Sequence, residues 1–301
     1  MFNKSWAPLL LVVLLSFSVR SYAQDDFTKI QQIEDSMLLT ADSMYHAFIP
    51  DDRAAYTERF VKQLVQALKE PNSWAYEFPK LQQEINIMYP EDRSFRIFNW
   101  GIAPTEVTRR YYGAVQLPEE ELKLYPLFDY SDKIKKCAED TVLTKGKWIG
   151  GIIYKIMANK VDGETVYTLF TLNAASAISN KKILDPMIIT DKGVTFGAPI
   201  FDIPSPCNPE NRSNRFILEY KKEVQASMNW DSDFNAIFFD RLVSQVNDPN
   251  RKYTYVPSGQ YDGLKWKGQK WVYVENLIPI DIRKDGEAPT PNPKFKQEKG
   301  N

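Results

Sequence analysis

The sequence predicts an α+β fold, in which an N-terminal helical hairpin is followed by a long antiparallel β-meander. Apolar residues recur at helical spacing between residues 25 and 82, and from about residue 85 the apolar pattern changes to a period of two. No alternation of strands and helices follows, which argues against a doubly wound parallel sheet. The strand spacing fits a sandwich, an open curved sheet or a propeller-like arrangement.

Two apolar stripes predict the helical hairpin. The first runs from Phe27 to Met44 and the second from Phe60 to Leu68, and Pro50 breaks the pattern between them. Short helices are marginal in isolation. We therefore expect the two stripes to pack on each other or on the sheet that follows.

Strands are predicted where apolar and polar residues alternate between turn residues. Asp162-Gly163 is a two-residue hairpin signal, because both positions tolerate positive φ. The predicted strands cover residues 93–100, 109–116, 122–128, 148–160, 165–172, 182–189, 194–201, 215–221, 225–230, 236–242, 264–266 and 270–274.

The start of the chain has the form of a secretory signal peptide. Lys4 precedes an apolar run over residues 8–19, and Ala23 ends a small-residue cleavage site, so the mature chain is expected to begin at Gln24. The apolar run is shorter than the about 20 residues that a bilayer span needs, and Arg20 follows it. We expect a periplasmic protein with no membrane span in the mature chain; an extracellular location is the less favoured alternative.

The predicted organisation has four parts. The last residues are rich in proline and lysine and nearly free of apolar residues, which predicts disorder. This tail is too short for a folded sorting domain, which favours retention in the periplasm. The parts are a signal peptide (1–23), a helical region (24–82), a β-rich domain (83–284) and the tail (285–301).

Composition and charge exclude several functions. The chain has 38 Lys+Arg against 39 Asp+Glu, and a nucleic-acid binder needs a concentrated surplus of cations. His46 is the single histidine, and no nucleophile motif or phosphate-binding loop is present. The sequence therefore indicates no cofactor and favours a non-catalytic protein over an enzyme.

Cys137 and Cys207 are the two cysteines of the chain. An oxidising compartment permits a disulfide between them, and two buried free thiols are the alternative. Neither has a neighbouring cysteine or histidine, which disfavours redox catalysis and zinc binding.

Several strings resemble an uncharacterised family of exported Bacteroidota proteins, over roughly residues 90 to 280. The resemblance implies a location in the cell envelope and brings no known activity and no catalytic residues. The strings are Arg110-Tyr-Tyr-Gly-Ala-Val-Gln-Leu117, Ser179-Asn-Lys-Lys-Ile-Leu-Asp185, Phe196-Gly-Ala-Pro-Ile-Phe201, Arg215-Phe-Ile-Leu-Glu-Tyr220, Phe238-Phe-Asp-Arg-Leu242 and Tyr261-Asp-Gly-Leu264.

The resemblance also implies a short acceptor pattern for O-glycosylation. Two of the three matches lie on the first predicted helix, where the methionine of the pattern is expected to face the core. The third match, Asp140-Thr141-Val142, makes Thr141 the glycosylation candidate.

Acidic residues on predicted strands are candidates for catalysis. Glycoside hydrolysis needs two acids that face each other across a cleft, about 5 to 10 Å apart. Asp202, Glu219 and Asp240 are the candidates, although nothing in the sequence selects a pair.

Asp231, Asp233 and Asn235 have the alternating oxygens that open a calcium loop. Ala236 and Leu242 stand where an EF-hand needs glycine and glutamate, so that motif is excluded. A hairpin turn is the default interpretation, and a looser calcium-binding turn is the alternative.

Aromatic residues make up 13% of the chain and suggest a binding surface. Trp266 and Trp271 flank a turn and are expected to lie opposite each other, and strand alternation places Arg110 and Tyr112 on one face. Either pair fits a protein interface or a ligand platform, although core packing and a solvated strand face are the ordinary roles of such residues.

Together these observations favour a non-catalytic periplasmic protein that acts through protein–protein contacts in cell-envelope assembly, export or maintenance. Its expected partner is another envelope protein. The alternative is a glycan-directed protein, either a binding module or a carboxylate-dependent hydrolase.

Overall fold

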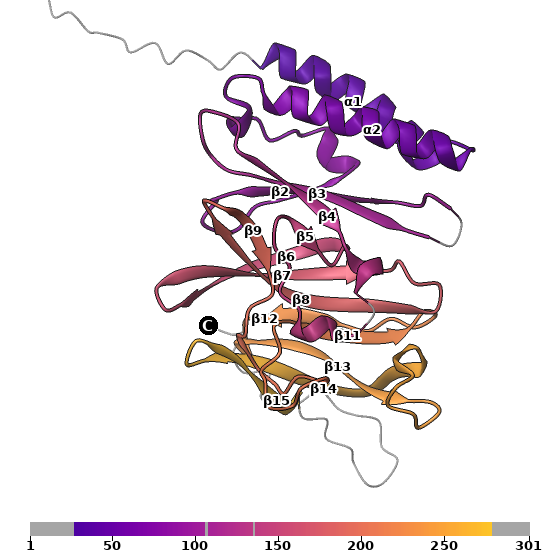
Figure 1. Cartoon of the computed structure of the whole chain (residues 1–301), viewed down its shortest axis with the longest axis vertical. Coiled ribbons are helices and arrows are strands. Elements are labelled where there is room, and N and C mark those ends of the chain that lie inside the picture. Colours follow the sequence, from indigo (N-terminus) through magenta and orange to yellow (C-terminus); the bar gives the residue numbers. More distant parts are fainter. Residues whose placement is uncertain (1–26, 106–107, 135, 279–301) are drawn as a thin grey trace, which may run out of the picture.

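The computed structural model describes residues 27–105, 108–134 and 136–278, and these form four stacked layers (Figure 1). A helical pair covers one face of sheet A, sheet B packs on the other face of sheet A, and sheet C packs on sheet B. The predicted α+β class is confirmed. The sequence left a sandwich, an open curved sheet and a propeller-like arrangement as alternatives, and the structure is a stack of three open sheets. The predicted signal peptide and tail lie outside the described residues.

The helical pair consists of α1 (Thr28–His46) and α2 (Pro50–Leu68). The predicted apolar stripes are buried, with Met37 of α1 and Phe60 of α2 packed in one core with Phe98 and Trp100 of sheet A. The sheet thus supplies the apolar surface that two short helices need.

The strands follow the layers nearly in sequence order. Neighbouring strands are antiparallel except for two parallel pairs, β4 with β5 and β10 with β15. Sheet A contains β1 (Asn86–Met88), β2 (Arg96–Ile102), β3 (Arg110–Gln116), β4 (Leu124–Asp129) and β5 (Lys147–Trp148). Sheet B contains β6 (Ile152–Val161), β7 (Glu164–Asn173), β8 (Ser179–Thr190), β9 (Gly193–Phe196) and β11 (Phe216–Lys221). Sheet C contains β10 (Phe201–Asp202), β12 (Met228–Asp231), β13 (Ala236–Ser244), β14 (Tyr255–Lys267) and β15 (Lys270–Ile278).

Sheets A and B are covered on both faces. In β2, Phe98 lies in the core beneath the helices, whereas its neighbour Ile97 lies in the core between sheets A and B. In β7, Leu169 shares that second core, and Phe170 lies in a third core between sheets B and C. Strands buried on both faces read as continuous apolar runs, and six successive residues of β7 are buried.

The predicted Asp162-Gly163 hairpin is confirmed. Both residues have positive φ, at 49° and 88°, and they join β6 to β7. The predicted strand 264–266 is too short, because β14 spans Tyr255–Lys267. Two other predicted strands are wrong in extent because the chain changes layer inside them. Residues 148–160 divide into β5 and β6 at Gly150-Gly151, and residues 194–201 divide into β9 and β10 after Gly197, which has φ +91°.

Arg96 of β2 is fully buried, and its hydrogen bonds connect the segment after α2, at residues 73–76, to sheet A. Its guanidinium donates hydrogen bonds to the carbonyls of Ser73 and Tyr76, at 2.7 and 2.6 Å, and to Gln116 Oε1 at 2.8 Å. The ring of Phe98 lies 4.9 Å from its central carbon. Burial lowers the pKa of Arg96, and these contacts replace the water that the cation has lost.

Arg215 is a second fully buried guanidinium, and it joins sheet B to the segment at residues 138–141. Its Nε donates to Asp185 Oδ1 at 3.0 Å, and its Nη1 donates to the carbonyl of Thr141 at 2.8 Å and to that of Ala138. The neighbouring Asn214 bonds the same segment through the carbonyls of Glu139 and Asp140.

The Cys137–Cys207 disulfide is present, with the two Cα atoms 5.7 Å apart. It links the segment before residues 138–141 to the loop that follows β10. None of the helices in the described part of the chain is long and apolar enough to cross a bilayer.

The Arg215–Asp185 pair should show strong thermodynamic coupling. We expect Arg215→Met alone to lower the free energy of unfolding by about 3–5 kcal/mol, because it leaves a buried carboxylate unpaired. The double variant Arg215→Met/Asp185→Leu should recover much of that loss. Urea unfolding of the wild type, the two single variants Arg215→Met and Asp185→Leu, and the double variant measures the coupling, and additive losses would contradict it.

Removal of the disulfide should also destabilise the chain. It closes a loop of 70 residues, for which chain entropy predicts a contribution of about 4 kcal/mol. We expect Cys137→Ser/Cys207→Ser to retain the fold, because Asn214 and Arg215 still hold the segment, but to unfold at a lower urea concentration. An unchanged midpoint would refute this expectation.

Candidate functional site

A pocket of about 510 Å³ lies where one end of sheet A meets sheet B. Residues at the start of β3 and the end of β4 form one side, and β8, β11 and the segment after β7 form the other. The segment between β4 and β5 closes a third side. The lining includes the charged residues Arg109, Arg110, Asp129 and Lys181, together with Asn173 and Ile217.

Asp129 organises the wall that sheet A contributes. One carboxylate oxygen accepts the backbone N–H of Ser131 at 3.0 Å and of Gly150 at 3.2 Å, and the other accepts that of Tyr111 at 3.2 Å. The Ser131 hydroxyl also donates to this carboxylate. Asp129 is thus engaged as an acceptor of local backbone groups, a role that fixes the wall and does not suit a general base.

Gly150 permits this arrangement. A Cβ atom at Gly150 would lie 2.4 Å from Asp129 Cγ, so a side chain there would displace the carboxylate. Asn173 holds Gly150 from the opposite side, since its Nδ2 donates to the Gly150 carbonyl at 2.5 Å. The crossover from β5 to β6 therefore forms a fixed part of the pocket.

Three cations line the pocket, and two of them have carboxylate partners. Arg110 Nη2 lies 3.4 Å from Asp132 Oδ2, and Lys181 Nζ lies 3.5 Å from Glu219 Oε2. The guanidinium of Arg109 forms no hydrogen bond or ion pair with any residue that the structure describes. Among the described residues, Arg109 is thus a cation without a carboxylate partner at the pocket rim.

Lys222 adds a fourth cation beside this rim. Its Nζ donates to the carbonyl of Ala174 at 2.9 Å, next to the lining residue Ala175. Burial lowers the pKa of Lys222, and repulsion from Arg109 lowers it further. Lys222 therefore adds to the positive charge at this end of the pocket.

The remaining lining is largely aliphatic. Ile149 is buried, and it borders the core between sheets A and B. No histidine or cysteine occurs among the described residues that line the pocket. The site therefore combines a fixed wall, aliphatic side chains and excess positive charge, which suits the binding of an anion that carries an apolar group. The aliphatic lining consists of Ile134, Ala138, Ile149, Ala175 and Ile217.

Of the predicted platform residues, the structure places Arg110 at the pocket and Tyr112 elsewhere. The Tyr112 ring stacks on Trp100, with centroids 5.7 Å apart, and packs against the core beneath the helices. Trp266 and Trp271 are paired opposite each other in register, as expected. Trp271 is fully buried and donates toward Thr168 in sheet B, so it presents no ring face to a ligand.

The three candidate catalytic acids lie on three strands and have separate partners. Asp202 forms an ion pair with Arg212 at 2.9 Å, and the Asp240 carboxylate accepts the backbone N–H of Ser227 at 2.6 Å. Glu219 accepts a hydrogen bond from Ser179 and pairs with Lys181. No hydrogen bond within the described ranges joins any two of the three, and Glu219 alone neighbours the pocket.

The predicted calcium-loop residues form a hairpin turn between β12 and β13. Asp231 Oδ1 accepts the backbone N–H groups of Asp233 and Phe234, at 2.8 and 3.1 Å, and Asn235 has φ +46°. The carboxylate of Asp231 therefore serves the turn itself.

Thr141, the glycosylation candidate, is half-buried. Its hydroxyl donates to the Ala138 carbonyl at 2.8 Å and accepts a hydrogen bond from the buried Arg215. A sugar attached to this oxygen would displace both contacts, so the structure gives the site no accessible acceptor.

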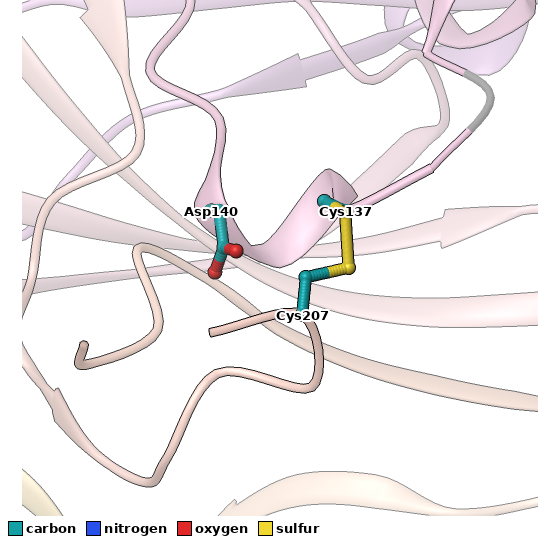
Figure 2. Close-up of side chains that lie close together, drawn as sticks. All are labelled: Cys137, Asp140 and Cys207. Atoms are coloured by element: carbon teal, nitrogen blue, oxygen red, sulfur yellow. A yellow bond between two sulfur atoms is a disulfide. The ribbon is translucent and has the colours of Figure 1, made fainter. Parts of the chain in front are cut away.

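Cys137, Cys207 and Asp140 form one group of potential metal ligands in the described part of the chain (Figure 2). The three ligand atoms lie within 4.8 Å of one another. The two sulfurs are bonded to each other, however, so neither is available as a thiolate. The two cysteines thus serve as a covalent cross-link, and the Asp140 carboxylate is the one ligand that this group could offer to a metal ion.

The sequence analysis missed three residues of the site. Arg109 stood next to the candidate Arg110, and the Arg109-Arg110 doublet was the signal that could have found it. Lys181 and Asn173 gave no comparable signal, because they reach the pocket through the pairing of β7 with β8.

Comparison with known proteins matches no family model, no curated protein and no solved structure. The site must therefore be interpreted from its own geometry.

A second polar cluster lies on sheet C and centres on Asp262, which is 2% exposed. Arg241 Nε lies 3.1 and 3.0 Å from its two oxygens, and the Asn276 backbone N–H and the Tyr273 hydroxyl also donate to it. Burial raises the pKa of Asp262, but these hydrogen bonds outweigh burial and hold its pKa below the ordinary value.

This lowered pKa predicts a loss of stability in acid. Because the folded state favours the ionised carboxylate, its contribution is present above the unfolded pKa of about 3.9 and disappears as the pH falls through the folded value. We expect Asp262→Asn to weaken the dependence of unfolding free energy on pH below about 4. Urea unfolding between acidic and neutral pH measures this slope, with Asp233→Asn as the exposed control. Equal slopes for Asp262→Asn and the wild type would contradict the assignment.

Proposed function

We propose that this chain is a non-catalytic exported protein that acts through contacts with another protein of the cell envelope, in assembly, export or maintenance. The observation that carries the proposal is Arg109, which has no carboxylate partner in the described part of the chain and lies at the rim of a fixed pocket with aliphatic lining. An uncompensated cation beside apolar surface suits recognition, because a partner can supply both the missing charge and the apolar contact.

The polar groups of the pocket favour binding over chemistry. Asp129 accepts three backbone N–H groups, and the hydroxyl of Ser131 donates to that same carboxylate. Hydrolysis by a nucleophile requires a base that takes its proton and a group that orients the base. His46 does not supply this base, since it lies exposed at the end of α1, where it contacts Asp42.

The glycan-directed alternative has weaker support. Carbohydrate sites use exposed aromatic faces, whereas Trp271 is buried and the Tyr112 ring stacks on Trp100. The carboxylates of Asp202, Glu219 and Asp240 have local partners and lie on separate strands.

Location and family remain predictions. A signal peptide and the resemblance to exported Bacteroidota proteins both support a periplasmic location. The Cys137–Cys207 disulfide agrees with it, because such bonds persist in oxidising compartments.

Site-specific photocrosslinking in cells tests the proposal. A photoreactive residue at Thr108, an exposed residue of the pocket rim, should give one discrete protein adduct, because a partner held at the pocket lies within its reach. The same residue at Lys270, on the hairpin of sheet C, is the matched control and should not give that adduct. Arg109→Glu should abolish the adduct from Thr108. Absence of an adduct, or equal adducts at both positions, would refute the proposal.

A further inference from the structure

We propose that the pocket binds the C-terminal end of a peptide chain, with the terminal carboxylate at Arg109 and apolar side chains against the aliphatic lining. This inference rests on the proposed function, because it assigns a chemistry to the partner at the same site. The inference goes beyond the proposed function because it names the ionised group that binds, a carboxylate, and the end of the partner chain that carries it.

The charges of the pocket call for a single negative charge. Asp132 neutralises Arg110, Glu219 neutralises Lys181, and the oxygens of Asp129 are turned to backbone N–H groups. Arg109 is left without a carboxylate among the described residues. A guanidinium binds a carboxylate through two parallel hydrogen bonds.

Lys222 adds positive charge beside Arg109. Its ammonium donates to the carbonyl of Ala174. Burial lowers the pKa of Lys222, and repulsion from Arg109 adds to this effect. An anion bound at Arg109 would reduce this repulsion.

The uncharged part of the ligand follows from the aliphatic lining. Ile149, Ala175 and Ile217 come from three different segments and face the same pocket. Its volume of about 510 Å³ lies within the usual range for small-ligand sites, about 300–1,000 Å³. The ligand therefore joins one carboxylate to aliphatic groups.

A chain end brings together the two groups that the pocket can bind. The lining places Arg109 in the same pocket as Ala175 and Ile217. A C-terminal aliphatic residue carries its carboxylate and its apolar side chain on one Cα atom. An internal aspartate or glutamate carries only the carboxylate, and its neighbours in the peptide would have to supply the apolar contact.

Peptide binding to the purified mature chain tests this inference. The probe is a hexapeptide, Gly-Ser-Ala-Ile-Val-Leu, with a fluorophore at its N-terminus and either a free or an amidated C-terminus. Fluorescence anisotropy should show at least tenfold tighter binding of the free acid than of the amide. Arg109→Met should reduce affinity for the free acid at least tenfold, whereas Lys270→Met, the matched surface control, should leave it unchanged.

The other outcomes separate this inference from the proposed function. Equal affinity of acid and amide, or no binding of either, overturns the C-terminal carboxylate, and an adduct from Thr108 would still support a protein partner at the pocket. If hexanoate displaces the peptide and binds as tightly as the peptide does, the site binds a small carboxylic acid, and the proposal of a peptide ligand is wrong. Binding of the free peptide without any adduct in cells would support this inference and refute the proposed function.

Discussion

The burial of sheet B on both faces is the constraint on which the rest of the structure depends. Leu169 faces sheet A and Phe170 faces sheet C, so the strand that carries them can be stable only between two other layers. Sheet A in turn has a second apolar face, which the helical pair covers. Four layers are thus the smallest arrangement that removes all three apolar interfaces from water.

Stacked layers create a problem at their edges, because the chain must cross between sheets while its polar groups remain satisfied. Arg96 and Arg215 satisfy backbone carbonyls of two connecting segments, one between α2 and β1 and the other between β4 and β5. At the crossing from β5 in sheet A to β6 in sheet B, Asp129 accepts the backbone N–H of Gly150, and Gly150 gives the carboxylate room. The pocket lies beside this crossing, which explains why its wall is fixed although it is built from connecting segments.

The elements with local signals were predicted from the sequence, and the layers were not. The helical hairpin and the Asp162-Gly163 turn depend on spacing and on local backbone preferences. At Gly150-Gly151 and after Gly197 the chain leaves one sheet and enters another. Strands of all three sheets have the same period-two pattern, so the sequence does not show where one strand ends and the next begins. Arg110 was predicted from strand alternation, together with Tyr112. Lys181 reaches the same pocket through the pairing of β7 with β8. Residues that strand pairing brings together have no local sequence pattern that predicts their proximity.

The order of the layers along the chain bears on how the disulfide can form. The helical pair and sheet A come first in the sequence, and the apolar face of sheet A that meets Leu169 is covered only when β7 packs on it. Cys137 precedes sheet B and Cys207 follows most of it. The two cysteines meet only when the strands between them have folded, so we expect oxidation of this pair to be a late step in the folding of the chain.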